Sequence, residues 1–294
     1  MTAPRLVLID GNACVYRAFF ALPALTNSKG TPTNAVLGFA TMLLKFIREE
    51  QPQSLAVAFD GPGPTSRHRE FAEYKAQRPP MPDNLSAQIP LVHRLLDCLR
   101  VPRLLIPGEE ADDILAALAL CASTDGYEVR IITSDKDLLQ VVDDRVVVRD
   151  PLMPRTLGPV EVVAKFGVAP TQIPDLLALM GDSSDNIPGV PGIGEKTARD
   201  LLQRFGNLDQ ILERLGEITK PKLRETLTAH AEQARMSKRL ATVRRDLALP
   251  CRLADLSCSE PDLNQLLPFL RELEFTRLIR QFEQPTLGMT GNDQ

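Results

Sequence analysis

Three short apolar segments each end in an aspartate, and this arrangement constrains the fold more than any other feature of the sequence. They are RLVLID (5–10), SLAVAFD (54–60) and EVRIITSD (128–135), and RVVVRD (145–150) has the same character. Segments with helical periodicity lie between them, at 34–50, 86–100 and 111–122. This alternation predicts an α/β domain with a mainly parallel sheet flanked by helices.

The aspartates that end these segments are candidates for a shared site. In an open parallel sheet, the carboxyl ends of the strands line one crevice, so Asp10, Asp60 and Asp135 should converge. Each also has a plainer explanation, because Asp-Gly at 10–11 and 60–61 is a common turn pair. Three such residues together favour the shared site.

Further acids gather in three short stretches, GEEADD (108–113), SDKD (134–137) and GDSSD (181–185). One or two acids would complement the dipole of the helix predicted over 111–122, but four in five positions exceed that need. Carboxylates about 4 Å apart repel by roughly 4 kcal/mol per pair at an effective dielectric of about 20. A cluster of this kind is therefore stable only if cations neutralise it or if the acids are spread apart on the surface.

The ligand types indicate which cations. Oxygen ligands without neighbouring histidine or cysteine favour Mg²⁺ or Mn²⁺. The three histidines are far apart and the five cysteines form no C-x-x-C pair, so a zinc site is not expected. Two hard ions about 4 Å apart can activate water and stabilise the leaving oxygen in phosphodiester cleavage.

The net charge of −4 hides a strong asymmetry. Residues 107–150 contain eleven acidic and four basic side chains, whereas residues 213–245 contain nine basic and four acidic ones. An acidic pocket beside a basic surface is compatible with a polyanionic partner, because phosphates respond to local potential. The N-terminus has no signal-peptide core and no segment is long enough to span a membrane, so a cytoplasmic protein is expected.

Five motifs, in order between about residues 5 and 282, resemble the 5′-nuclease domain of bacterial DNA polymerase I and, more widely, flap endonucleases and phage 5′ exonucleases. They are LIDGNACVYRAFFALP, AVAFDGPGPTSRHREFAEYKAQRPPMP, GEEADDILAALA, ITSDKDLLQ and MGDSSDNIPGVPGIGEKTA. The resemblance implies a PIN-like nuclease domain over 1–160 with a helical arch at about 61–95. It also implies a helix–three-turn–helix DNA-binding domain over 161–283, followed by a tail or truncated linker (284–294).

The resemblance implies nine metal ligands or water-bridged neighbours: Asp10, Asp60, Glu110, Asp112, Asp113, Asp135, Asp137, Asp182 and Asp185. Glu109 falls where the family is not acidic and is left out. The first ion would involve Asp10, Asp60, Glu110 and Asp112, and the second Asp135, Asp137 and Asp185. Asp113 and Asp182 would have outer roles. Two Mg²⁺ ions, replaceable by Mn²⁺, are expected.

The same resemblance implies that Lys75 and Arg78, in a Y-K-x-x-R pattern, reach the scissile phosphate. DNA contacts are expected from Tyr16, Arg17, Arg67, Tyr74, Gly192, Gly194, Lys196 and Thr197. GVPGIGEKT is not a P-loop, because Glu195 separates Gly194 from Lys196. It is better interpreted as a hairpin between helices whose amides approach phosphates, with a K⁺ expected at 189–197.

The leading hypothesis is a structure-selective 5′→3′ exonuclease and 5′-flap endonuclease on DNA. It would leave 5′-phosphate and 3′-hydroxyl ends and serve replication and repair. The expected substrates are DNA 5′ ends, flaps and nicks, with RNA-primed ends as a further candidate, cleaved by a nucleoid-associated monomer. A cleavage-dead protein that binds branched DNA and a PIN-type ribonuclease are the alternatives. The presence of all nine acids argues against the first, and the hairpin against the second. Whether the chain is a stand-alone nuclease or the front of a polymerase is left open.

Overall fold

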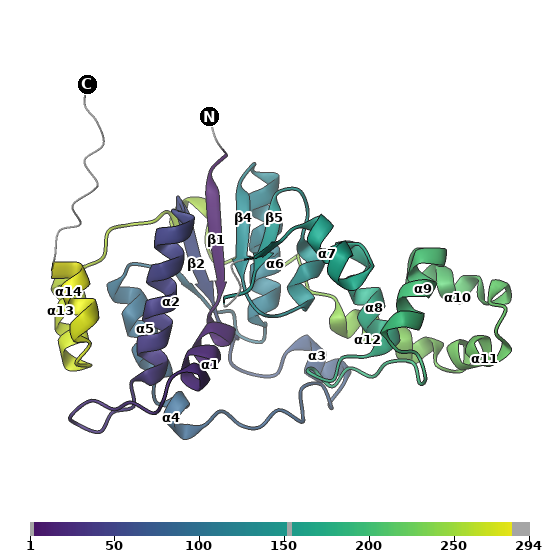
Figure 1. Cartoon of the computed structure of the whole chain (residues 1–294), viewed down its shortest axis with the longest axis horizontal. Helices are drawn as coiled ribbons and strands as arrows, with labels where there is room; N and C mark the ends of the chain where they lie inside the picture. The colour runs from purple at the N-terminus through teal and green to yellow at the C-terminus, as the bar shows by residue number, and fades with distance from the viewer. Residues whose placement is uncertain (1–2, 152–154, 284–294) are drawn as a thin grey trace.

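The computed structural model describes residues 3–151 and 155–283 and has a six-stranded sheet at its centre (Figure 1). The strand order is β3-β2-β1-β4-β5-β6, with every neighbouring pair parallel except β5 and β6. The strands are β1 (Arg5–Asp10), β2 (Ser54–Ala58), β3 (Arg103–Leu104), β4 (Glu128–Ile132), β5 (Val146–Arg149) and β6 (Thr156–Leu157). The predicted α/β class and mainly parallel sheet are confirmed.

The register of the central strands brings their carboxyl ends to one edge. Asp10 pairs with Ala58 of β2, and Ile9 pairs with Ile132 of β4. The residues that follow β2 and β4 therefore lie beside Asp10. This is the convergence that the apolar segments predicted.

Helices cover both faces of the sheet. Successive side chains of β1 point to opposite faces, so each face has its own apolar core. Val7 and Ile9 face a core that includes α1 (Gly11–Ala21), α2 (Asn34–Glu50) and α5 (Ile89–Cys98). Leu6 and Leu8 face α6 (Ala111–Thr124) and the helices beyond it.

The segment between β2 and α5 contains less helix than the arch we predicted. It comprises α3 (Ser66–Glu70), a run of turns, and α4 (Asp83–Ser86). Six prolines between 62 and 90 account for this, because proline removes a backbone donor and restricts the residue before it. We call residues 66–82 the arch segment.

The second half of the chain is mostly helical. It comprises α7 (Pro159–Phe166), α8 (Ile173–Met180), α9 (Glu195–Phe205), α10 (Leu208–Glu213), α11 (Pro221–Ala229) and α12 (Ala231–Ala241). Helices α9 to α11 project away from the sheet (Figure 1).

The chain then returns to the sheet. Helices α13 (Leu263–Glu272) and α14 (Thr276–Glu283) join the core beside α5, at the opposite end of the molecule from α11 (Figure 1). These two helices fall within the bounds expected for the DNA-binding domain, 161–283. The predicted tail, 284–294, lies outside the described residues. In the part of the chain that the structure describes, no helix is long and apolar enough to cross a membrane.

Candidate active site

A cleft of about 610 Å³ opens at the carboxyl end of the strands. Six carboxylates line it, from Asp10, Asp60, Asp112, Asp135, Asp182 and Asp185. Tyr16 of α1, Lys136, and Lys75 and Arg78 of the arch segment also line it. Six separate parts of the chain thus contribute charged groups to one cavity.

Asp10 and Asp60 are held by hydrogen bonds that direct their carboxylates. Asp10 caps α1 by accepting from the Ala13 amide at 2.9 Å, and its other oxygen accepts from the Thr133 hydroxyl at 2.8 Å. Asp60 accepts from the Asn12 side chain at 2.6 Å and from the Ala111 amide, in the first turn of α6, at 2.9 Å. Helix capping by Asp10 and the shared site are therefore compatible, since these hydrogen bonds orient two of the acids that line the cleft.

The acids in the cleft raise one another's pKa. Burial, opposed in part by the bonds from Ala13 and Thr133, raises the pKa of Asp10 to about 6, and the charges of Asp135 and Asp60 add to this. Burial, followed by the charges of Asp135 and Asp10, raises the pKa of Asp112 well above its usual range. These carboxylates are close enough to require a shared counter-ion when they ionise.

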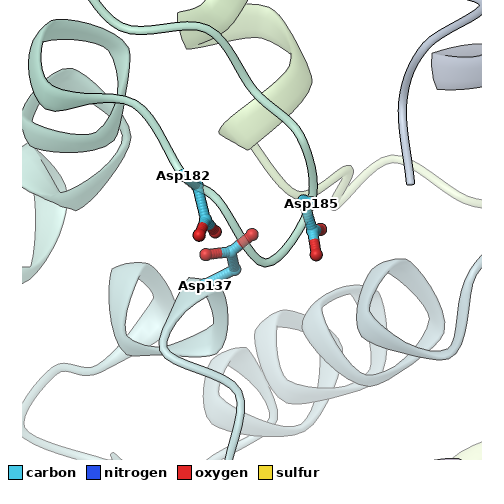
Figure 2. A group of neighbouring side chains, drawn as sticks. All are labelled: Asp137, Asp182 and Asp185. Carbon is cyan, nitrogen blue, oxygen red and sulfur yellow. The ribbon is translucent and has the colours of Figure 1, made fainter. Parts of the chain in front are cut away.

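A second group of acids meets beside the first. Asp137, Asp182 and Asp185 each offer an oxygen, and these oxygens all lie within 4.8 Å of one another (Figure 2). Asp137 begins the 3-10 helix η1 (Asp137–Val141), while Asp182 and Asp185 lie on the loop after α8. Burial, then the charges of Asp135 and Asp185, raises the pKa of Asp137 well above normal.

This group fits a divalent cation. Oδ1 of Asp137 is buried and has no hydrogen-bond partner among the described residues, which is rare for a carboxylate. The donors are all carboxylate oxygens, as Mg²⁺ and Mn²⁺ prefer. Asp182, for which the resemblance implies an outer role, belongs to this group, and Nζ of Lys136 lies 2.7 Å from its Oδ1.

A close approach of two backbones positions the Asp182–Asp185 loop. A Cβ at Gly189 would lie 2.4 Å from the carbonyl carbon of Met180 and 2.5 Å from the nitrogen of Gly181. Only glycine permits this contact. The residues that follow α8 are thereby fixed against the start of residues 189–197, which we call the glycine hairpin. This contact also fixes the loop that carries Asp182 and Asp185.

The arch segment places its cations on Glu110 and Asp185. Nζ of Lys75 lies 2.8 Å from Oε2 of Glu110 and 3.6 Å from Oδ2 of Asp185. Arg78 donates to Asp185, and the Tyr74 hydroxyl is within hydrogen-bond distance of both carboxylates.

The pKa values of Glu110 and Asp185 are lowered, whereas those of Asp10 and Asp112 are raised. Although burial raises the pKa of Glu110, the positive charges of Lys75 and Arg67 outweigh it and lower that pKa overall. At Asp185, burial likewise raises the pKa, but the positive charges of Lys75 and Arg78 outweigh it and lower the pKa overall. Both groups are thus held ionised by protein cations.

Several expected site residues do not line the cleft, among them Asp113, Arg67 and Tyr74. Asp113, which is fully buried, accepts two hydrogen bonds from Arg67, at 2.6 and 2.8 Å. Arg67 is itself buried, as is Tyr74, so neither side chain is on the surface where we had expected DNA contacts. The sequence contained no signal for the Arg67–Asp113 ion pair, because its partners come from segments 46 residues apart.

The acid that we set aside also has a partner. Glu109 accepts from Arg244 at 2.7 Å, and its carboxylate does not line the cleft. Arg17, an expected DNA contact, lies 3.8 Å from Asp150.

The glycine hairpin places its expected DNA-contacting residues on the surface. Gly192, Gly194 and Lys196 are exposed and Thr197 is half-buried. Gly194 precedes α9, whose first turn presents free backbone amides.

Comparison with known proteins agrees with this geometry. The family model described as the 5′-3′ exonuclease N-terminal resolvase-like domain matches residues 5–167. The chain belongs to the 5′-3′ exonuclease family. The model of the family's C-terminal SAM fold matches residues 168–264, so both domains of this nuclease family are present.

Relatives of this nuclease include free-standing and fused proteins. The 5′-3′ exonuclease of Aquifex aeolicus is 43% identical over 279 residues, which cover 95% of each chain. DNA polymerase I of Bacillus caldotenax is 45% identical over 288 residues, 96% of this chain but 33% of the polymerase. The chain therefore spans about a third of the length of such polymerases.

Two solved structures share the fold. A mutant of the T5 5′-exonuclease has a TM-score of 0.65 at 21% identity, covering 96% of this chain and all of its own. The catalytic core of Rad2 in complex with DNA substrate has a TM-score of 0.65 at 17% identity, covering 95% of this chain and 92% of its own. At these identities the likeness shows the fold alone.

Proposed function

We propose that this nuclease is a structure-selective 5′→3′ exonuclease and 5′-flap endonuclease on DNA, which leaves 5′-phosphate and 3′-hydroxyl ends. The observation that carries the proposal is one cleft that joins six carboxylates to the arch cations Lys75 and Arg78. Carboxylates bind hard cations and the arch cations bind a phosphate, and phosphodiester hydrolysis requires both.

The acids fall into two groups that would hold two divalent ions. We propose Asp10, Asp60, Asp112 and Asp135 for one ion, and Asp137, Asp182 and Asp185 for the other. This division differs from the one that the resemblance implies. Glu110, expected at the first ion, is paired with Lys75 and does not line the cleft, and Asp135, expected at the second, is close enough to Asp10 and Asp112 to raise their pKa. We assign Mg²⁺, with Mn²⁺ as a substitute, because every donor is a carboxylate oxygen. When bound, such ions would activate the attacking water and stabilise the leaving 3′ oxygen.

Lys75 and Arg78 would exchange their carboxylate partners for the scissile phosphate. Both now contact Asp185, and Arg78 is half-exposed, so it can turn towards a substrate in the cleft. Their charges would offset negative charge that develops on the phosphate during cleavage. Tyr16, which lines the cleft on α1, would stack on the terminal base.

The glycine hairpin would hold the duplex part of the substrate through one strand's backbone. Gly194 has φ of −93°, and a Cβ there would meet nothing within 4 Å, so the protein's own packing does not require glycine. A phosphate that approaches closely would require it. Lys196 and Thr197 lie in the first turn of α9 beside it, and we also assign a K⁺ to the carbonyls of 189–197.

The relatives support DNA with 5′ ends as the substrate. One T5 structure is described as a flap endonuclease pseudo-enzyme-product complex with DNA and metal ions, and the Rad2 structure contains a DNA substrate. We extend this to nicks and RNA-primed flaps, to removal of primers and flaps in replication and repair, and to a monomeric enzyme.

The test is cleavage of an end-labelled 5′ flap in Mg²⁺, in Mn²⁺ and in chelator, with product lengths resolved on a gel. Cleavage at the flap junction and from the 5′ end, lost in chelator, is the expected result. A matched RNA flap separates a DNA nuclease from a ribonuclease with the same sheet chemistry. Binding of the flap without cleavage in either metal would contradict the proposal.

A further inference from the structure

An exposed aromatic ring lies next to the cleft and has no role in the site described so far. Phe20 is 71% exposed, and it is the only exposed phenylalanine in the described part of the chain. Leaving a ring of this size in water forgoes the stabilisation that its burial would give. Its exposure therefore calls for a reason outside the folded core.

Phe20 continues a surface that begins inside the cleft. It lies four residues after Tyr16 on α1, so both side chains are on the same face of the helix. Their ring centroids are 6.5 Å apart with an interplanar angle of 31°, within the range of an aromatic pair. Tyr16 lines the cleft, whereas Phe20 lies beyond it.

The ring is held in place from the core side. Phe19 packs partly against the hydrophobic core and meets Phe20 edge to face, with centroids 5.1 Å apart. The helix that carries both rings is capped at its N-terminus by Asp10, a carboxylate of the site. With a rise of about 1.5 Å per residue, Tyr16 and Phe20 lie about 9 and 15 Å along the helix axis from Asp10.

We propose that Tyr16 and Phe20 form a two-step stacking surface, on which Phe20 binds the unpaired base adjacent to the one at Tyr16. Unpaired bases are the fitting occupant because the aromatic surface is continuous with a cleft that takes a phosphodiester. Every base has a flat face, so the contact tolerates any sequence. This inference rests on the proposed function and adds a specificity for single-stranded nucleotides beyond the scissile phosphate.

The experiment is a binding titration with a four-nucleotide 5′ flap, in chelator, in which each flap base in turn is replaced by an abasic residue. In the unmodified protein, two adjacent positions should be sensitive, each weakening binding on the order of tenfold when the base is removed. Phe20→Leu should abolish the sensitivity of one position, to within about twofold, and Tyr16→Leu that of the other. Phe20→Trp should retain both.

Two controls show whether stacking on the Phe20 ring is responsible. Val160, on α7, is 76% exposed, so Val160→Ala removes a comparably exposed apolar side chain and should keep both sensitive positions. Thermal unfolding of Phe20→Leu should match the unmodified protein, because the ring is exposed. If Phe20→Leu keeps the sensitivity of every position, the ring serves another partner and the inference is overturned. If the unmodified protein fails to cut the intact flap in Mg²⁺, the proposed function itself falls.

Discussion

Arg67 and Asp113 form a two-point ion pair inside the protein, with Nη1 2.6 Å from Oδ2 and Nη2 2.8 Å from Oδ1. The side chains are only 7% and 1% exposed. Arg67 also donates to the carbonyls of Leu240 and Thr242, so one guanidinium connects α3, α6 and the end of α12. Asp113 is thus part of the scaffold that fixes the arch segment and, through the same turn of α6, Glu110.

Removing Arg67 should therefore destabilise the protein. Arg67→Ala leaves the buried Asp113 carboxylate without its partner, and the free energy of unfolding should fall by about 3–5 kcal/mol. Arg67→Lys should recover only part of this, because an ammonium cannot make the two-point contact. Chemical denaturation measures the free energy of unfolding, and Arg69→Ala, at an exposed residue of the same helix, is the control. An unchanged unfolding energy together with weaker DNA binding would restore Arg67 as a DNA contact.

Asp112 should show opposite effects on stability and activity. In the metal-free protein its charge is unfavourable, because burial and the charges of Asp135 and Asp10 raise its pKa. Asp112→Asn should raise the melting temperature in chelator by a few degrees, since about 1 kcal/mol corresponds to roughly 2–4 °C at this size. The same variant should lose cleavage and retain flap binding. Asp97→Asn, at an exposed acid, should change neither, and near-normal turnover of Asp112→Asn in Mg²⁺ would remove Asp112 from the site.

The stability of the metal-free protein should fall as pH rises from about 4 to about 6. The folded protein holds a proton on Asp10 with a pKa of about 6, whereas the unfolded chain releases it near 3.8. The folded state binds more protons in this window, so rising pH favours unfolding, by up to about 3 kcal/mol for a pKa raised from 3.8 to about 6. The lowered pKa values of Glu110 and Asp185 act in the opposite direction, and their contribution to stability is lost as pH falls below about 4.5 and 3.8, respectively.

Thermal melts between pH 4 and 8 in chelator measure this slope, and Asp10→Asn should flatten it. Mg²⁺ should stabilise the protein increasingly above about pH 6, because a cation binds the ionised carboxylates. A metal-free protein whose stability rises steadily through this range would show that the carboxylates of the cleft are not mutually repulsive.

The sequence predicts those parts of the site whose position follows from a short run of neighbouring residues. An apolar run followed by aspartate indicates both a buried strand and its carboxyl end, so Asp10, Asp60 and Asp135 could be placed together. The two-residue strands β3 and β6 could not be predicted, because so short a segment has no periodicity.

The way each acidic side chain points depends on the tertiary structure, so it could not be predicted from the sequence. Asp112 and Asp113 are adjacent, but successive positions on a helix point about 100° apart, so one lines the cleft and the other meets Arg67. Tyr74 likewise belongs to a motif with Lys75, and only the fold shows that its ring is buried.

Lys75 should matter more for the chemical step than for binding. It contacts Glu110 and Asp185 at the edge of the cleft, so its ammonium can pass to a bound phosphate without a change in fold. Lys75→Ala should slow single-turnover cleavage of a flap by about 10²–10³-fold, the usual effect of losing one donor to developing charge. The flap dissociation constant should change far less. Lys45→Ala, at an exposed lysine of α2, is the control, and an effect confined to binding would make Lys75 a phosphate anchor.

Gly194 should be required for duplex binding and not for folding. An alanine Cβ meets nothing within 4 Å at either Gly194 or Gly216, and neither glycine has a positive φ. Gly216→Ala should melt at the same temperature as the unmodified protein, and Gly194→Ala only slightly below it, because alanine caps a helix N-terminus less well than glycine. Gly194→Ala should weaken binding of a duplex without a flap, because the methyl group keeps a phosphate away from the amides at the start of α9. Gly216→Ala should bind normally. Equal duplex binding by both variants would show that the backbone at Gly194 does not approach the DNA.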